Sequence, residues 1–213
     1  MNKNSEFFRS FHNAMFPYKV YIILGGGWLR VATFNTKDGE AHIHDVYIHL
    51  QDDPKTALRM VATKHSQVGI SQKGLEKLKN TMGFTQLRFI CHKKGKTRFE
   101  VITKNNHKGF EVVNYFTSNI TERPSACGSF DNLPTDDSAL GSFCNRWMDG
   151  KWGAVDEEGK STVGNERLYG IIAQIPEKQR YFNTGGFKGL FQCDDGADEN
   201  GDQATGSWRI YVR

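Results

Sequence analysis

The residues with the clearest chemical potential form an acidic segment near the end of the sequence. The candidate ligands in it, each with a side-chain oxygen, are Asp194, Asp195, Asp198, Asn200 and Asp202. Oxygen donors clustered on a glycine-containing loop are what Ca²⁺ prefers. Thr205 and Arg209 stand where an EF-hand counted from Asp194 or Asp198 would need a glutamate, so that motif is excluded. Two interpretations stay open, a calcium site of another kind and a solvated acidic turn.

A second group lies in a long polar stretch, 118–164, which is rich in Ser, Asp, Asn and Gly. Its members are Asp136, Asp137, Phe143, Trp147 and Trp152. Aromatic faces beside carboxylates are a common way to hold sugars, because the rings match the apolar faces of the sugar. We predict ligand contacts from the two tryptophans and the two aspartates, which could also help to complete a calcium site. The alternative is that the rings pin the stretch onto the core.

A third group is basic and surrounds a glycine between two expected strands. It consists of Lys93, Lys94, Lys96 and Arg98. The formal net charge is only +4, yet residues 1–110 hold 18 Lys and Arg against 8 Asp and Glu, a net +10, whereas residues 111–213 hold 10 against 16, a net −6. The group is either a solvated hairpin tip or a contact for a polyanion such as a sulfated glycan, silicate or an acidic matrix.

The opposite charges of the two portions also suggest head-to-tail association into a homo-oligomer or filament, because such contacts do not close. Nucleic acid is not an expected partner, since no zinc finger, recognition helix or single-strand binding signature accompanies the basic group. No apolar run approaches the roughly 18 residues that span a bilayer, so no membrane role is expected.

Catalysis finds little support in the sequence. No GxSxG motif occurs, and no cysteine stands in a recognisable catalytic setting. His42 and His44 would share one side of a strand and could bind a metal together, but catalytic zinc needs a third protein ligand. We therefore expect a protein that is not an enzyme.

Four cysteines, Cys91, Cys127, Cys144 and Cys193, form no CxxC pair. This spacing argues against a zinc ribbon and favours two disulfides in an extracellular protein. Of the three connectivities we favour Cys127–Cys144, closing a local loop, and Cys91–Cys193, tying distant strands. Four reduced cysteines in a cytosolic protein are the alternative.

A glycosylation sequon at Asn119 is consistent with secretion. No apolar leader follows the opening residues, so we expect a mature form whose leader has been removed.

The elements that must position these groups are mostly strands. Alternation or apolar runs predict strands over 19–24, 28–34, 41–50, 87–93, 97–104, 112–117, 167–175, 181–192 and 207–213. Strict alternation places Trp28 and Phe34 on one face of the second of these. Asp53-Pro54 and Ser71 predict the starts of two short helices, over 56–64 and 72–81, the second ending before Gly83.

These elements predict an α+β fold that is mostly β, with an antiparallel sheet, few short helices and long disulfide-stabilised loops. At 213 residues, a single domain over 1–213 is expected, in which 1–16 is an N-terminal lead-in with aromatic residues at helical spacing and 118–164 is an irregular loop region.

Several segments resemble known extracellular domains. Residues 16–21 (FPYKVY) followed by 25–28 (GGGW) resemble the opening of fibrinogen-like domains, and 208–213 (WRIYVR) is similar to the closing strand of intelectin-type lectins. The segments between them look like an uncharacterised secreted module of cnidarians and sponges. The resemblance implies a secreted recognition or matrix module that binds glycans with calcium. We expect a lectin-like binding module, the alternative being a self-assembling structural protein of a matrix, filament or mineral.

Overall fold

The computed structural model describes residues 23–24, 27–35, 49–63, 67–93, 98–178, 180–184, 191–195 and 206–213. Most of the predicted strand over 19–24, the lead-in 1–16 and most of the strand predicted over 41–50 lie outside these residues. Within the described part, strands account for 38% and helices for 34%.

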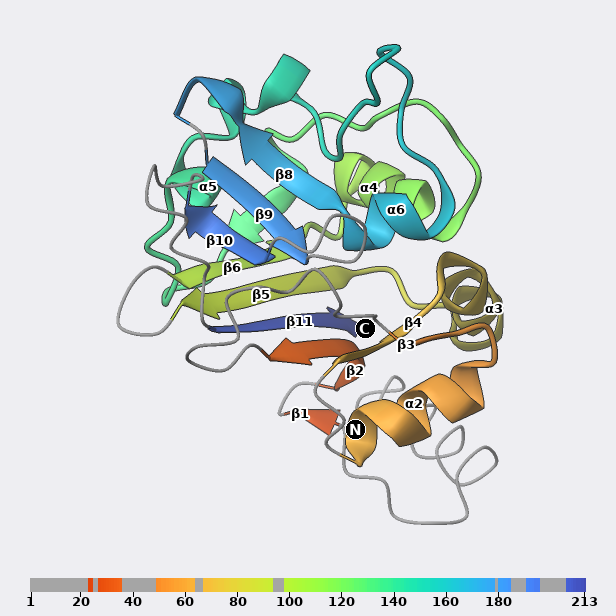
Figure 1. Ribbon diagram of the computed structural model, residues 1–213. Coiled ribbons are helices and arrows are strands. Elements are labelled where there is room, and N and C mark those ends of the chain that lie inside the picture. Colours follow the sequence, from red (N-terminus) through yellow and green to blue (C-terminus); the bar gives the residue numbers. More distant parts are fainter. Residues whose placement is uncertain are drawn as a thin grey trace.

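An eight-stranded sheet forms the centre of the fold (Figure 1). Its order is β3 (His49–Gln51), β4 (Gln67–Ile70), β2 (Trp28–Asn35), β11 (Gly206–Val212), β5 (Leu87–Lys93), β6 (Arg98–Thr103) and β7 (Phe130–Asn132), with β1 (Ile23–Leu24) paired to β2. The β3–β4 pair is parallel and the other described pairs are antiparallel. The last strand of the chain is therefore central, between β2 and β5.

A smaller antiparallel sheet of β8 (Ile171–Ile175), β9 (Arg180–Thr184) and β10 (Phe191–Asp195) lies over β5 and β6 (Figure 1). Phe182 of β9 joins the two sheets, with its ring centroid 5.1 Å from that of Phe99 and 6.2 Å from that of Phe89. The Cys91–Cys193 disulfide links β5 to β10 across the same interface. The predicted pairing of these two cysteines is thereby confirmed.

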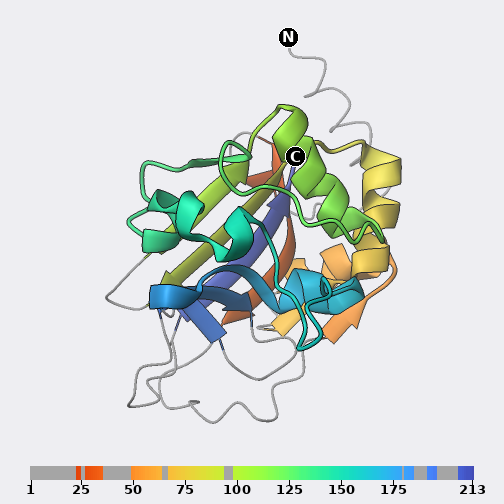
Figure 2. The same cartoon turned by 90° about the horizontal axis from the view of Figure 1, so that it is seen from above.

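Helices lie at the ends and along one side of the two sheets (Figures 1 and 2). They are α2 (Pro54–Ala62), α3 (Gln72–Met82), α4 (His107–Thr117), α5 (Ala139–Ser142) and α6 (Gly164–Tyr169), with 3₁₀ turns η1 (Cys144–Arg146), η2 (Met148–Gly150) and η3 (Pro176–Lys178).

The predicted caps are confirmed. The Asp53 carboxylate accepts from the Thr56 amide at 2.8 Å, the Ser71 hydroxyl accepts from the Gly74 amide at 3.0 Å, and Gly83 ends α3 with φ of 66°.

The predicted strand over 112–117 is wrong, because this segment is the second half of α4. Asn106 caps the helix by accepting from the Gly109 amide at 2.9 Å, and a Cβ at Gly109 would collide with the Lys104 carbonyl. The helix buries Val112, Val113 and Phe116. Capping and burial thus outweigh the strand propensity of its β-branched and aromatic residues.

The alternation expected in β2 is also interrupted. The register between β2 and β11 shifts between Arg30 and Ala32, which is a β-bulge. Trp28 consequently packs in a cluster with Ile90 and Tyr211, whereas Phe34 belongs to the main core.

The α+β class and the antiparallel sheet are confirmed, and helices contribute more than predicted. No helix in the described ranges is both long and apolar enough to cross a membrane.

The two disulfides should stabilise the fold unequally. Cys91–Cys193 closes a separation of 102 residues and Cys127–Cys144 one of 17. In the chain-entropy model such loops contribute about 5 and about 3 kcal/mol respectively. We expect Cys91→Ala/Cys193→Ala to lower the free energy of unfolding more than Cys127→Ala/Cys144→Ala, as measured by urea denaturation. A larger loss from the short-loop pair would contradict this order.

Candidate functional site

The irregular region 118–164 is anchored to the core by its tryptophans. Trp147 and Trp152 are 2% and 0% exposed and contact each other in a T-shaped pair with centroids 4.9 Å apart. The Trp147 indole donates to the Leu140 carbonyl at 2.9 Å, and the Trp152 indole donates to the Ser129 hydroxyl at 2.8 Å. The expectation that these rings offer exposed faces to a ligand is wrong, because each indole N–H has a buried partner. The rings pin the region to the core instead.

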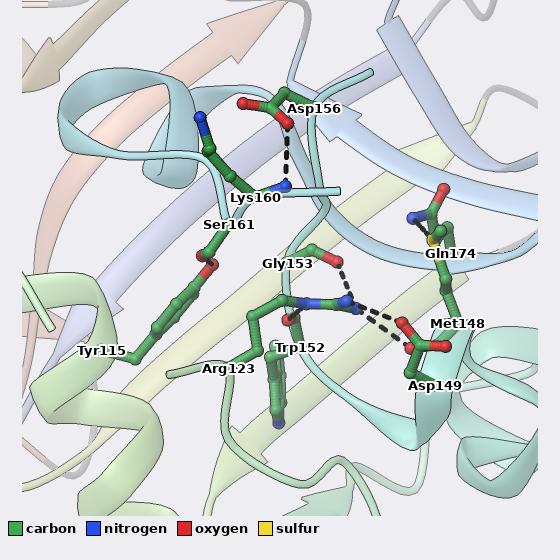
Figure 3. Close-up of polar contacts among 10 residues, drawn as sticks. All are labelled: Tyr115, Arg123, Met148, Asp149, Trp152, Gly153, Asp156, Lys160, Ser161 and Gln174. Atoms are coloured by element: carbon green, nitrogen blue, oxygen red, sulfur yellow. Dashed lines mark hydrogen bonds and ion pairs between the residues drawn. The ribbon is translucent and has the colours of Figure 1, made fainter. Parts of the chain in front are cut away.

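A buried arginine binds the backbone of the 148–153 turn (Figure 3). Arg123 is 7% exposed and donates to the carbonyls of Met148 at 3.0 Å, Trp152 at 2.9 Å and Gly153 at 3.2 Å. Its Nη1 also forms an ion pair with Asp149 at 3.0 Å. Asp149 has φ of 56°, so the turn includes a left-handed residue. One guanidinium therefore donates to three main-chain carbonyls of a segment that lies outside the two sheets, next to the isolated β-bridge between Ser125 and Lys151.

A second buried arginine fixes both ends of the region. Arg167 of α6 donates to the carbonyls of Tyr115 at 2.7 Å, Ser118 at 3.0 Å and Thr162 at 3.0 Å, and its guanidinium lies 4.1 Å from the Tyr115 ring centroid. The Tyr115 hydroxyl is 3.2 Å from that of Ser161 (Figure 3). The start and the end of the region are thus held against α4.

Asp194, a predicted metal ligand, forms hydrogen bonds inside the protein. It is buried, has φ of 54°, and accepts hydrogen bonds from the Ala139 and Leu140 amides at 2.7 and 2.8 Å. These amides belong to the first turn of α5, so the carboxylate holds the start of that helix. Burial raises the pKa of Asp194, and the two backbone hydrogen bonds act in the opposite direction.

Only one other residue of the acidic segment, Asp195, is among the described residues. Asp198, Asn200 and Asp202 lie outside the described residues, and Asp195 is described only as a strand residue. Within the described ranges, no group of three or more His, Cys, Asp or Glu side chains could hold a metal ion. The calcium site stays a prediction.

The two predicted aspartates of the irregular region attach it to β6. Asp136 accepts from the Glu100 amide at 2.6 Å and from the Ser138 hydroxyl at 3.0 Å, and Asp137 accepts from the Arg98 amide at 2.6 Å. Burial raises the pKa of Asp136. Asp136 and Asp137 thus position the loop that leads into α5.

The sequence analysis missed the buried Glu100. Its carboxylate is 2.7 Å from His92 Nε2 and accepts a hydrogen bond from the Thr135 hydroxyl. Burial acts to raise the pKa of Glu100, but the hydrogen bonds from Thr135 and His92 outweigh it and lower the pKa. Alternation along β6 places Glu100 on the face opposite Phe99 and Val101, so the sequence pattern carried no signal of its burial, which accompanies its contacts with His92 and Thr135.

On the outer surface of the region, two cations contact an exposed aromatic ring. Phe143 follows α5 and is 39% exposed. The Arg146 guanidinium is 5.0 Å from its ring centroid and the Lys178 ammonium 5.2 Å. The next residue, Cys144, forms the Cys127–Cys144 disulfide, which confirms the second predicted pairing. We call Phe143, Arg146 and Lys178 the cation–aromatic surface. No pattern in the sequence indicates Arg146 or Lys178 as site residues.

The predicted polyanion residues are only partly described. Arg98 begins β6 and exchanges backbone hydrogen bonds with the Asp137 loop, and Lys93 ends β5. Lys94, Lys96, His42 and His44 lie outside the described residues. Asn119 is exposed in the segment after α4, as a glycosylation acceptor must be.

We expect Arg123→Met to lower the free energy of unfolding by about 3 to 5 kcal/mol, because buried carbonyls and a carboxylate would lose their donor. The matched control is Asp149→Asn, which removes only an exposed ion-pair partner and should cost less than about 1 kcal/mol. Denaturant titration of both variants measures this difference. Equal losses would mean that the ion pair, and not the carbonyl contacts, provides the stability.

The buried carboxylate of Asp194 gives a pH dependence of defined sign. Its folded-state pKa lies above the unfolded value near 3.8, so the folded state binds the proton first as the pH falls. The test compares the free energy of unfolding of the native chain with that of the Asp194→Asn variant. The native value minus the variant value should increase as the pH falls through the raised pKa of Asp194, and it should level off below about pH 3.8. Urea denaturation over a pH series tests this, and a decreasing difference would show that the ionised form is the stabilised one.

Neither a protein-family model, nor a curated protein, nor a solved structure matches this chain. The resemblance to fibrinogen-like and intelectin-type domains therefore stays an expectation, and the function is argued from the geometry of the described residues.

Proposed function

We propose that this chain is a non-catalytic extracellular recognition module that binds glycans through the cation–aromatic surface. The observation that carries the proposal is the exposed ring of Phe143 beside the Cys127–Cys144 disulfide. Single exposed apolar side chains are ordinary, and Phe110 is equally exposed. Phe143 differs because two cations contact its ring and a disulfide anchors the next residue.

The position of the ring is fixed through its backbone. The Phe143 amide donates to the Ala139 carbonyl at 3.0 Å, and its carbonyl accepts from the Arg146 amide at 2.9 Å. The disulfide at Cys144 adds a covalent constraint directly next to it. Because the backbone is already ordered, little conformational entropy is lost when a ligand stacks on the ring.

Glycans suit such a surface because the carbon-bound hydrogens of a sugar form an apolar face that an aromatic ring can cover. The tryptophans that the sequence suggested for this role serve as the internal support of the region instead, and Phe143 takes their place as the contact ring. Calcium at the 194–202 segment would be a separate contribution to the same activity.

The two disulfides indicate an oxidising compartment, which supports secretion. In a eukaryotic secretory pathway the exposed Asn119 would then carry an N-linked glycan. The alternative role, a self-assembling matrix, filament or biomineral-associated protein, stays a prediction from the charge distribution of the sequence.

The proposal is tested on a glycan array with the native chain, Phe143→Ala and Phe110→Ala. Phe110 is a matched control, because its side chain is 38% exposed on α4. We expect Phe143→Ala to weaken binding about tenfold or more, the loss of a well-placed stacking contact, and Phe110→Ala to leave it unchanged. A repeat with chelator separates any calcium contribution. The proposal would be rejected if the native chain bound no glycan either with or without chelator, or if the two variants lost the same affinity.

A further inference from the structure

We infer that the glycan bound at the cation–aromatic surface is acidic, carrying a carboxylate or sulfate group on the sugar that stacks on Phe143. The inference builds on the proposed function and adds the class of ligand. It rests on the two cations that contact the ring and on the nearby carboxylates, which are occupied by other groups of the protein.

The two cations come from separate parts of the chain. Arg146 belongs to η1 and Lys178 to η3, the turn between β8 and β9, and both side chains are exposed. Within the described residues neither forms an ion pair, whereas exposed lysines elsewhere do, such as Lys160 with Glu158. Their contacts with the ring hold both charges within reach of a group bound to its face.

The carboxylates that hold α5 and the loop before it are occupied by backbone amides, and Asp149, the carboxylate nearest to Arg146 in sequence, forms an ion pair with Arg123. Asp194 accepts from two amides of α5, Asp136 from the Glu100 amide, and Asp137 from the Arg98 amide. Glu177 is exposed beside Lys178 in sequence, and no ion pair between these neighbours occurs in the described part of the chain. The cations at the ring are thus available to an external anion.

An acidic sugar fits both the exposed ring and the two cations beside it. Its apolar face covers the ring, while its anionic group reaches the guanidinium and the ammonium. A neutral sugar would use only the ring. Single-stranded nucleic acid prefers a series of exposed rings, and the next aromatic residue along the chain, Trp147, is buried.

The test compares three immobilised polysaccharides: heparin (sulfated), hyaluronan (carboxylated) and dextran (neutral). The variant Arg146→Gln/Lys178→Gln removes both cations, and Lys55→Gln/Arg59→Gln removes two exposed cations of α2, at the far side of the molecule from α5 in both views (Figures 1 and 2). We expect the native chain to bind at least one acidic polysaccharide about tenfold more tightly than dextran, with an affinity that falls as salt rises. The first variant should lose about tenfold and the control should retain its affinity.

Preference between heparin and hyaluronan would identify the anionic group, and either result supports the inference. Binding of dextran as tight as that of the acidic polymers would overturn it while leaving the proposed function standing. Binding to no glycan would overturn both. An equal loss in the α2 control, or equal affinity for poly(dT), would also overturn it, because attraction by net charge alone would then explain the binding. Circular dichroism of each variant verifies that the fold is retained.

Discussion

The hydrogen bonds from two buried guanidinium groups to main-chain carbonyls are the interaction on which this structure depends. Residues 118–164 contain little regular structure, yet much of their backbone lies against the core. Buried carbonyls without partners are costly, and a chain with little helix or sheet must obtain donors from turns, side chains or water. Arg123 and Arg167 provide them, each to three carbonyls. The tryptophan pair packs on the sheet through Phe89 of β5 and Phe130 of β7.

The buried acidic groups have a related role at α5. This helix has only four residues, too few to be stable alone, and Asp194 binds its first two amides while Asp136 fixes the residues that precede it. Phe143 immediately follows. The acidic segment that the sequence suggests as a ligand site therefore begins with a residue that supports the cation–aromatic surface from within. Because Cys193 precedes Asp194, the disulfide between the sheets also helps to place this carboxylate.

Local signals in the sequence predicted the features that depend on neighbouring residues. The caps of α2 and α3, the β5–β6 pair and the closing strand β11 were predicted because each has a short signature. The failures depend on distant contacts. Segment 112–117 has strand-forming residues, but packing on α3 and β6 makes it a helix. The bulge in β2 places Phe34 on the opposite face of the sheet from Trp28, and no residue type in that strand indicates a bulge.

The candidate site was predicted only in part for the same reason. The polar composition of 118–164 suggests that Trp147 and Trp152 are exposed, whereas their burial depends on Ser129, Leu140 and the sheet beneath them. Lys178 approaches Phe143 only because η3 connects β8 to β9 beside α5, a proximity that spacing along the chain does not indicate. The disulfide pairing, in contrast, was the favoured one of the three that four cysteines allow, and it is confirmed.

The arginine anchors have a consequence for how this surface can change over time. Arg123 and Arg167 bind carbonyl oxygens, and every amino acid has one at the same place in the backbone. Outward-facing side chains between the anchored points can therefore be replaced without removing an anchor. Mutation could alter what the surface recognises while the frame beneath it persists, a separation of scaffold and specificity that makes the region a suitable starting point for diversification and for library design.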